Sequence, residues 1–412
     1  SNIAPPAPGT PPEPSTASPK SLFALPPAPL EPPVPELDPP EPATPPDPPD
    51  PPVPGLPPFI PLPPATPLLP LASKLAVAAE WFASPRGGNP DDLPDESVAS
   101  FVQRHFGEAM VENIVDPLLA GVYGGDCRRL SIRSVLPRFW EMEQKYGSLT
   151  RATLRARRER FKKMRSAENS QGYAPLPLFM TLKGGLDQMV EALTAQIESF
   201  RIHLRIRVAA IELPRDPASQ YKIRCDDGVT HDADAIVLAL PTHECARLLA
   251  PISPAAANPL GQIPYSSSMT VSLAYGAGAR ELLPPGFGFL SPRKENRRLL
   301  ACTFVHGKFN HRVPEGKALV RCFLGGARDA EVLKLSDPEV IALVRGELRS
   351  ILNFDPEPLF SRIHRWPSSM AQYEVGHRER VAAIQKELAN QPGLFLAGNA
   401  YSGIGISDCI RT

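Results

Sequence analysis

The distribution of proline constrains this chain more than any other feature. Of its 53 prolines, 30 lie within the first 70 of the 412 residues. Proline has no backbone N–H and a fixed φ, so a segment this dense in proline forms neither helices nor sheets and buries no core. Residues 1–70 are therefore predicted to be extended polyproline II or disordered. Only the remainder of the chain is available to fold.

Three interpretations of the proline-rich segment stay open. It is a tail or spacer, which is the ordinary role of such composition. It is a ligand for proline-reading domains, although the P-x-x-P spacing recurs by chance at this density. It is a stretch that is not native coding sequence, because the composition changes abruptly near residue 70.

Charge and cysteine usage exclude several classes of function. Basic and acidic residues balance at 44 each, so no overall field favours a nucleic acid as partner. The six cysteines are scattered without a C-x-x-C or a histidine at zinc-ligand spacing, which argues against a disulfide scaffold and against a metal site. The longest apolar runs fall short of the roughly 20 residues that cross a bilayer. We therefore expect a protein of the cytoplasm, or one peripheral to the cytoplasmic membrane.

Apolar spacing predicts an all-helical segment over residues 95–165. Its predicted helices start after a cap at Asp95 and then cover 109–119, 131–146 and 148–164. Positions 151–165 hold eight basic residues and one acid. That helix face is simply solvated, or it attracts anionic lipid or the carboxylates of a substrate; we favour lipid.

The rest of the chain has mixed α/β and α+β character. An apolar run at 178–182, a Gly184-Gly185 turn and a helix at 186–197 with one buried face come first. Strands are then predicted at 202–208, 221–225 and, as a buried run, 234–240. An α+β portion follows, with strands at 269–275, 299–305 and 318–324 and a helix at 337–352. The chain returns to a helix at 378–389 and a strand at 394–397.

The C-terminal segment carries the clearest functional pattern. An apolar strand leads into Gly398, a loop follows with Gly403 and Gly405, and a helix begins near Ser407. Glycines let a backbone approach a bound group closely, and amides at a helix start suit a phosphate or an electron-rich ring edge. By itself such a loop is equally an ordinary turn.

Several further segments occur in a characteristic order. They include Asp116-Pro-Leu-Leu-Ala-Gly-Val-Tyr-Gly-Gly-Asp126, Lys183-Gly-Gly-Leu, Gly286-Phe-Gly-Phe-Leu, Gln372-Tyr-Glu-Val-Gly-His377 and Asp408-Cys-Ile-Arg. Over about residues 80 to 412 the chain resembles the oxygen-dependent protoporphyrinogen oxidases. The resemblance implies a flavoprotein of the amine-oxidase-like superfamily that uses FAD in heme biosynthesis. It would remove six electrons from protoporphyrinogen IX in three rounds, each passing two electrons to O2.

This chemistry needs a buried apolar slot for a flat macrocycle rather than a metal or an acid/base pair, so no catalytic side chain is predicted. Matching the segments implies substrate contacts at Gly121, Phe287, Leu290, Leu300, Thr303 and Phe323. It implies cofactor contacts at Val208, Gly403, Ile404, Gly405 and Ile406. Without the resemblance these are ordinary core, strand and turn residues, and His377 is a structural histidine rather than a general base.

The resemblance also implies a domain order. It consists of the proline-rich segment 1–70, a helical membrane-binding-like domain at 71–177, an incomplete FAD/NAD(P)-binding-like fold at 178–250 and 391–412, and a mixed-sheet substrate domain at 251–390. A homodimer is the family's expected assembly.

One departure from the family pattern puts the cofactor in doubt. Dinucleotide folds open with G-x-G-x-x-G between a strand and a helix, and this sequence has no such motif. The proline-rich segment stands where the family keeps that motif, its ribose-binding acid and an arginine for the substrate's propionates. We therefore predict that this chain binds FAD weakly or not at all, because each lost charge-assisted hydrogen bond removes roughly 1.5 to 3 kcal/mol.

Two alternatives to protoporphyrinogen oxidation stay open. One is the oxidation of coproporphyrinogen III to coproporphyrin III, which would go with more basic residues around the slot. The other is a non-catalytic remnant that binds a porphyrin or a partner. An amine oxidase or desaturase of the same superfamily is disfavoured by the segments at 116–126 and 408–411.

Overall fold

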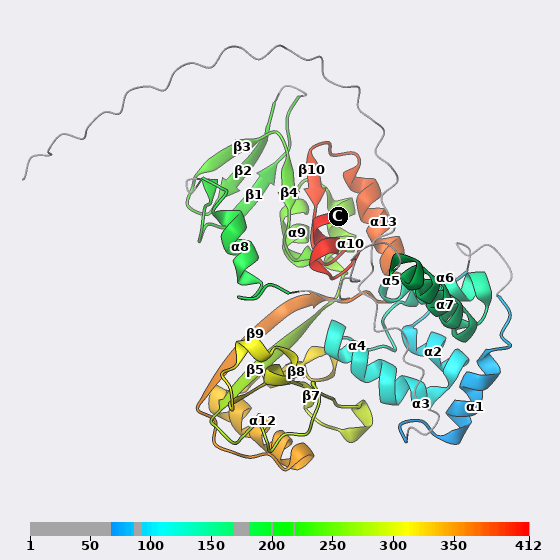
Figure 1. The fold of residues 1–412 in the computed structure, drawn as a ribbon. Helices are drawn as coiled ribbons and strands as arrows, with labels where there is room; N and C mark the ends of the chain where they lie inside the picture. Colours follow the sequence, from blue (N-terminus) through cyan, green and yellow to red (C-terminus); the bar gives the residue numbers. More distant parts are fainter. Residues whose placement is uncertain (1–66, 86–92, 169–180, 199–200, 217–218, 412) are drawn as a thin grey trace, which may run out of the picture. The chain divides into compact units, whose positions relative to one another are not determined.

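The computed structural model describes residues 67–85, 93–168, 181–198, 201–216 and 219–411 (Figure 1). The predictions for residues 1–66, and most of the predicted apolar run at 178–182, lie outside these residues. Contacts join residues 54–412 in one unit, which contains every described element. The domain boundaries drawn within 71–412 stay a prediction.

The all-helical character predicted for residues 95–165 is confirmed. The helices are α1 (Leu71–Glu80), α2 (Val98–Phe106), α3 (Glu108–Met110), the π-helix η1 (Val111–Val115), α4 (Asp116–Tyr123), α5 (Ile132–Val135), α6 (Pro137–Tyr146) and α7 (Leu149–Glu168). Their apolar faces share a core with Phe101, Leu119 and Trp140 among its buried side chains. Helix α2 ends at Gly107, whose φ of 85° suits glycine.

Two details of the helical prediction are wrong. Ser97, not Asp95, caps α2: its side-chain oxygen accepts from the Ser100 amide at 3.1 Å, because Ser97 immediately precedes the first helical residue. The helix predicted over 131–146 is broken into α5 and α6. Leu136 between them has φ −132° and ψ 53°, since the ring of Pro137 disfavours helical geometry in the residue before it.

The α/β part is built from two small sheets and the helices around them. The antiparallel sheet contains β1 (Val208–Glu212), β2 (Tyr221–Cys225) and β3 (Thr230–Ala233). The parallel pair contains β4 (Ile236–Leu238) and β10 (Leu394–Leu396). The helices are α8 (Asp187–Thr194), α9 (Thr242–Leu249), α10 (Pro254–Gly261), α13 (His377–Leu388) and α14 (Ile406–Arg411).

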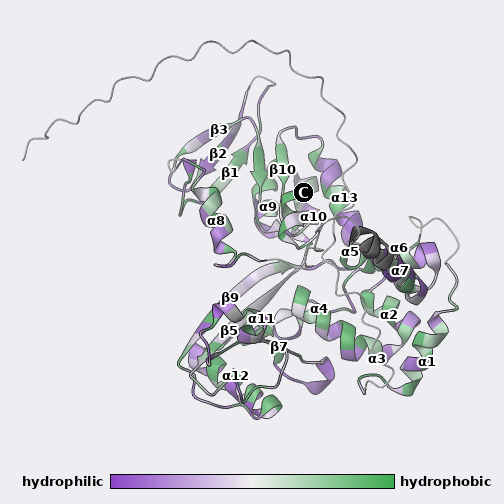
Figure 2. Cartoon of the chain, viewed as in Figure 1, coloured by the Kyte–Doolittle hydropathy of each residue, from purple (hydrophilic) through white to green (hydrophobic). Residues whose placement is uncertain are grey.

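Two predictions for this part are wrong, and a third is confirmed only in part. The strand expected from residue 202 begins only at Val208, after Arg205 takes a φ of 62°. Helix α8 buries none of its residues, although a buried face was expected. The buried strand predicted over 234–240 is confirmed only over β4, where Ile236 and Leu238 are buried but Val237 is 61% exposed. Among the described residues no further strand or layer covers these apolar surfaces, and β10 is likewise apolar along its length (Figure 2).

The strands predicted in the α+β portion are confirmed and form a five-stranded antiparallel sheet in the order β6-β7-β8-β5-β9. Its strands are β5 (Tyr265–Tyr275), β6 (Gly288–Leu290), β7 (Leu299–Phe304), β8 (Ala318–Gly325) and β9 (Phe360–Ala371). Shorter elements are α11 (Val305–Lys308) and the 3-10 helices η3 (Arg293–Glu295), η4 (Asn310–Arg312), η5 (Gly326–Arg328) and η6 (Ala330–Lys334).

Helix α12 (Asp337–Leu352) packs on one face of this sheet and has the predicted bounds. The Ser336 side chain and Glu339 form a reciprocal capping box at its start, and Asn353 ends it in a left-handed conformation. Its buried residues Val340, Val344 and Leu348 share a core with one face of the strands. The opposite face of the same sheet, called the uncovered face here, has no helix among the described residues packed along it as α12 is, and it carries the candidate site.

Candidate functional site

A cavity of about 290 Å³ lies where α4 meets the uncovered face of the five-stranded sheet. Phe323 on β8 and Trp366 on β9 supply its aromatic surface, and Thr270 lies between these strands on β5. The lining has more apolar than polar surface. An apolar slot with aromatic walls suits a flat, largely apolar ligand better than a small polar one.

Strand register builds this face from residues far apart in the sequence. Thr270 is paired with Phe323 on one side and with His364 on the other, so all three point to the same side of the sheet. Alternate residues of β5, such as Met269 and Val271, point to the α12 side and are fully buried. Successive side chains of a strand point to opposite faces of the sheet. One set therefore packs in the core with α12, and the other set faces the site.

The C-terminal end of α4 closes one side of the cavity. Gly124 caps the helix with a φ of 58°, and its carbonyl accepts from the Ala327 amide at 2.7 Å. A side chain at Gly124 would be strained by that φ and would lie 3.1 Å from the Ser266 hydroxyl. The Gln372 amide donates to the Tyr123 carbonyl at 2.9 Å and so holds the same helix end against the sheet.

The structure places the six predicted substrate residues near one another but not in one cavity. Gly121, Leu300 and Phe323 line it, and a Cβ at Gly121 would lie 3.3 Å from the side chain of Leu290. Thr303 lies outside the lining, on β7 opposite Arg321, and Phe287 is 69% exposed just before β6. Their contacts with a substrate stay a prediction.

A buried ion pair fixes α4 to the sheet beside this cavity. Asp116, the first residue of α4, is fully buried, and its carboxylate accepts from the Arg328 guanidinium at 2.5 Å. Arg328 also donates to the Ser291 carbonyl at 3.1 Å. Because Arg328 follows Gly326, which lines the cavity, this pair sets how α4 lies over the slot.

The same acid belongs to a group with metal-ligand potential. Oxygen and sulfur atoms of Asp116, Asp126 and Cys127 lie within 4.8 Å of one another. Arg328 and Arg293 already pair with the two carboxylates. Burial, with a contribution from Asp116, raises the pKa of the Cys127 thiol to about 12, so it stays protonated. The group is therefore better described as an ion-pair network than as a cation site.

The predicted cofactor loop is organised by a buried tyrosine. The Tyr373 hydroxyl donates to the Asn399 carbonyl at 2.8 Å and accepts from the Gly403 amide at 2.9 Å. These two bonds fix the loop between Gly398 and Gly405, in which Ile404 packs against the core. Gly403 has a φ of 148°, and a Cβ there would lie 2.7 Å from the Asp408 carboxyl group. Glycine at this position is therefore required by the loop itself.

The structure favours the structural interpretation of His377. Its ring is 1% exposed and stacks on Tyr373 with 4.1 Å between ring centroids. Burial, with the nearby charge of Arg380, lowers the pKa of this imidazole to about 4, so it is neutral at physiological pH. A buried ring covered by Tyr373 has no access to a substrate in the cavity.

The residues present do not fit a complete flavin dinucleotide. The loop at 398–405 supplies glycines for close approach to a ring, and Val208 is half-buried on β1. The pyrophosphate, in contrast, needs a glycine loop between a strand and a long helix. The sequence has no G-x-G-x-x-G, and parallel pairing among the described strands joins β4 and β10 alone. The chain thus offers one part of a flavin site without the phosphate cradle.

Helix α7 keeps the basic character predicted for it. Arg151, at its start, donates to the Tyr146 carbonyl at 2.8 Å and so belongs to the fold. Arg155, Arg157 and Arg158 are exposed. Within the described part of the chain, no helix has both the length and the apolar composition to cross a bilayer.

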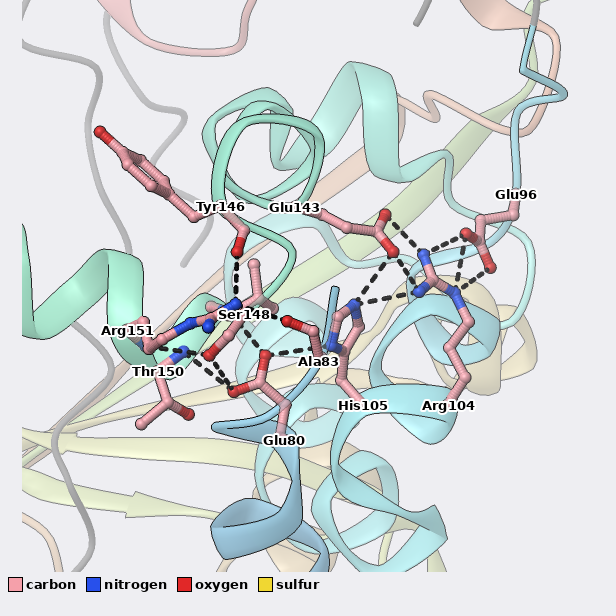
Figure 3. Close-up of polar contacts among 11 residues, drawn as sticks. Glu80, Ala83, Glu96, Arg104, His105, Glu143, Tyr146, Ser148, Thr150 and Arg151 are labelled. Atoms are coloured by element: carbon pink, nitrogen blue, oxygen red, sulfur yellow. Dashed lines mark hydrogen bonds and ion pairs between the residues drawn. The ribbon is translucent and has the colours of Figure 1, made fainter. Parts of the chain in front are cut away.

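A second polar group, which the sequence analysis missed, lies inside the helical part (Figure 3). His105 on α2 lies between two buried carboxylates, 3.2 Å from Glu80 on α1 and 3.3 Å from Glu143 on α6. Arg104 pairs with Glu143 and, at 2.8 Å, with Glu96. These five residues are called the His105 cluster below. A cavity of about 480 Å³ adjoins it.

The charges of the His105 cluster are mutually stabilised. Burial opposes the charge of His105, but hydrogen bonds to Glu143 and Glu80 outweigh it and raise the pKa of the imidazole. Burial also opposes the charge of Glu143, yet hydrogen bonds from His105 and Arg104 lower the pKa of that carboxyl to about 2. Glu80 further accepts from the Ser148 hydroxyl at 2.9 Å and from the Thr150 amide at 3.0 Å at the start of α7. The cluster therefore joins four helices, which is a structural role.

No sequence motif predicts the His105 cluster. Its members lie far apart in the sequence: Glu80, Arg104, His105 and Glu143 lie in three helices, and Glu96 precedes α2. The only local signal is that His105 falls on the apolar face of its helix, a position at which a histidine needs partners.

Comparison with known proteins gives consistent matches. A family profile described as "Flavin containing amine oxidoreductase" matches residues 37–412. The coproporphyrinogen III oxidase of Bacillus subtilis is 33% identical over 339 residues, which cover 82% of this chain and 69% of that protein. Protoporphyrinogen oxidase 1, chloroplastic, of Arabidopsis thaliana is 30% identical over 333 residues, covering 77% and 61%. The chain thus spans about two thirds of the length of these relatives.

A solved structure from Exiguobacterium sp., provisionally described as a protoporphyrinogen oxidase, has a similar fold. It superposes with a TM-score of 0.69 at 28% sequence identity and covers 84% of this chain and 71% of that one.

Proposed function

The chain belongs to the flavin-containing amine oxidoreductase family, in its porphyrinogen oxidase branch, and we propose that it binds a porphyrinogen against the uncovered face of the five-stranded sheet for oxidation to the porphyrin. The observation that carries this proposal is the apolar cavity with Phe323 and Trp366 on its walls. Aromatic side chains stack on flat rings with little loss of conformational entropy.

Two substrates are supported by different observations. The segment resemblance favours protoporphyrinogen IX, which carries two propionates. The relative from Bacillus subtilis is named for coproporphyrinogen III, which carries four. Both are tetrapyrrole macrocycles with the same ring skeleton, so an apolar cavity alone does not distinguish them. The groups around the cavity would determine which of the two binds.

Flavin binding is the property of the family that this chain by itself supports least. The family is defined by flavin, yet the residues present lack the phosphate cradle described above. We propose that the chain keeps the substrate-binding half of the site and has low affinity for FAD when it is isolated. Binding of the macrocycle is therefore the property to test first.

Tryptophan fluorescence tests the proposal directly. Trp366 lines the cavity and is 50% exposed, so a porphyrin bound there should quench its emission. Coproporphyrin III and protoporphyrin IX serve as stable probes. Phe323→Ala should weaken binding about tenfold or more, since a buried aromatic contact contributes 0.5 to 1.5 kcal/mol beyond its area. Phe82→Ala, at an 81% exposed phenylalanine outside the cavity, is the matched control.

The results of this fluorescence experiment either support or contradict the proposed site. Quenching that disappears in Trp366→Phe and weakens in Phe323→Ala supports the proposed site. Binding of neither porphyrin, or equal affinities in Phe323→Ala and Phe82→Ala, contradicts it.

A further inference from the structure

The uncovered sheet face carries a second row of side chains beside the apolar cavity. Ser272 on β5 is paired with Arg321 on β8 and with Arg362 on β9. The same register places Thr303 on β7 opposite Arg321. These four residues, called the arginine row here, therefore point to the same side of the sheet as Thr270 and Phe323, which line the cavity.

Strand geometry fixes the distances within this face. Arg321 and Arg362 flank one intervening strand, so their backbones lie about 10 Å apart, at roughly 4.8 Å per strand. Each is two residues along its strand from the row that contains Phe323 and His364. That step is about 7 Å, within the length of an arginine side chain. The two arginines thus lie on the same face of the sheet as the apolar slot, one row beyond the residues that line it.

These arginines differ from the others of the same sheet region in their partners. Arg298 pairs with Asp329 at 2.6 Å, and Arg365, on the opposite face of β9, pairs with Asp337 at 2.7 Å. Arg321 and Arg362 are exposed, and no carboxylate of the described residues lies within ion-pair distance of either. The nearest polar contact of Arg321 is the Ser272 hydroxyl, 3.5 Å from its Nε.

We propose that Arg321 and Arg362 bind carboxylates of the substrate and that they determine which porphyrinogen the site accepts. This inference rests on the proposed function, because it takes the macrocycle to lie in the adjoining cavity. A guanidinium matches a carboxylate with two parallel hydrogen bonds. With the apolar ring on Phe323, the propionates project over the arginine row. A substrate with four carboxylates gains more from this edge than one with two.

The row also explains the placement of Thr303. This residue is absent from the cavity lining but lies in the arginine row, where its hydroxyl faces the same edge. A substrate whose ring fills the cavity and whose propionates reach the row would contact both sets. Of the predicted substrate residues outside the cavity, Thr303 would thereby contact the same substrate, whereas Phe287 belongs to neither set.

Binding measurements with a matched pair of probes test the inference. Coproporphyrin III carries four carboxylates, and its tetramethyl ester has the same ring without them. Arg321→Gln and Arg362→Gln should each weaken the acid about tenfold and the double variant about a hundredfold, since one charge-assisted bond is worth roughly 1.5 to 3 kcal/mol. The ester should bind all variants equally. Arg349→Gln, on α12 behind the opposite face, is the control.

The results distinguish this inference from the proposed function. Equal affinities of the unchanged protein and the arginine variants for the acid would refute the role of the arginine row, while leaving the macrocycle site in place. An unchanged protein that binds neither the acid nor the ester would refute the proposed function itself. An equal loss of affinity for the ester and for the acid would likewise refute the role of the arginine row, because the loss would then not depend on the carboxylates.

Discussion

Replacing Glu143 by glutamine should loosen the helical part of the chain far more than its small change in shape implies. The carboxylate of Glu143 is 2% exposed and faces two cations, His105 and Arg104. The amide keeps the volume but removes the negative charge. Arg104 retains Glu96, whereas His105 is left with Glu80 alone. The buried imidazolium therefore loses half of its compensation.

Two independent lines give the size of this effect. The pKa of the Glu143 carboxyl falls from 4.5 to about 2 in the folded chain, which corresponds to about 3 kcal/mol at roughly 1.4 kcal/mol per pH unit. Removing one partner of a buried ion pair costs about 3 to 5 kcal/mol by general experience. We therefore expect Glu143→Gln to reduce the free energy of local unfolding by about 3 kcal/mol.

The three titrating groups Glu80, His105 and Glu143 also determine the pH range in which the cluster stabilises the fold. The raised pKa of His105 stabilises the fold fully below its ordinary value of 6.5, and this contribution is lost as the pH rises through the raised pKa. The lowered pKa values of Glu80 and Glu143 stabilise the fold above their ordinary value of 4.5, and this contribution is lost as the pH falls. The cluster therefore contributes most between about pH 4.5 and 6.5.

Hydrogen exchange read by mass spectrometry is the suitable assay, because it reports each helix separately. A loss of about 3 kcal/mol accelerates exchange of the α6 and α7 amides about a hundredfold at pH 6. The difference from the unchanged protein should shrink as the pH is raised and His105 loses its proton. Glu141→Gln, at an exposed acid of the same helix, is the control. Identical exchange in the two variants would refute the argument.

Three further predictions follow from the fold. Asp116→Asn leaves Arg328 buried without its charge partner, so the chain should lose about 3 to 5 kcal/mol of stability in denaturant unfolding; a loss below 1 kcal/mol would contradict this. Leu348→Ala opens a cavity between α12 and the sheet and should cost about 2 to 5 kcal/mol, seen as faster exchange in β5 but not in α6. FAD added to the isolated chain should be removed by gel filtration, and one bound flavin per chain would show that the phosphate cradle is dispensable.

Local structure in this protein follows from local sequence wherever an element is complete by itself. Helix α12 has the predicted bounds because its capping box and its apolar spacing lie within seventeen consecutive residues, 336–352. The strands β5, β7 and β8 are likewise predicted, as short segments of strand-like sequence.

The predictions that do not hold have a different cause, which is the lack of a covering neighbour. Helix α8 and strand β4 have the apolar patterns of buried elements, but a pattern states only that a surface prefers to be covered. It does not supply the neighbour that covers it, and among the described residues these surfaces stay exposed. The sequence has no G-x-G-x-x-G motif, and apolar surfaces of α8 and β4 are exposed. Both observations concern the FAD-binding-like part, and both support the interpretation that these residues form one part of a flavin site.

The sequence by itself determined the order of helical, α/β and α+β parts, the family resemblance and the lack of a phosphate-binding motif, because each depends on residues close together in the chain. Only the tertiary structure decided which distant residues meet. Gly121 and Phe323 share a cavity, Arg321 and Arg362 share an edge, and His105 finds its two carboxylates on other helices. The physical reason is that strand register and helix packing are fixed by contacts between segments far apart in sequence, whose partners no local pattern specifies.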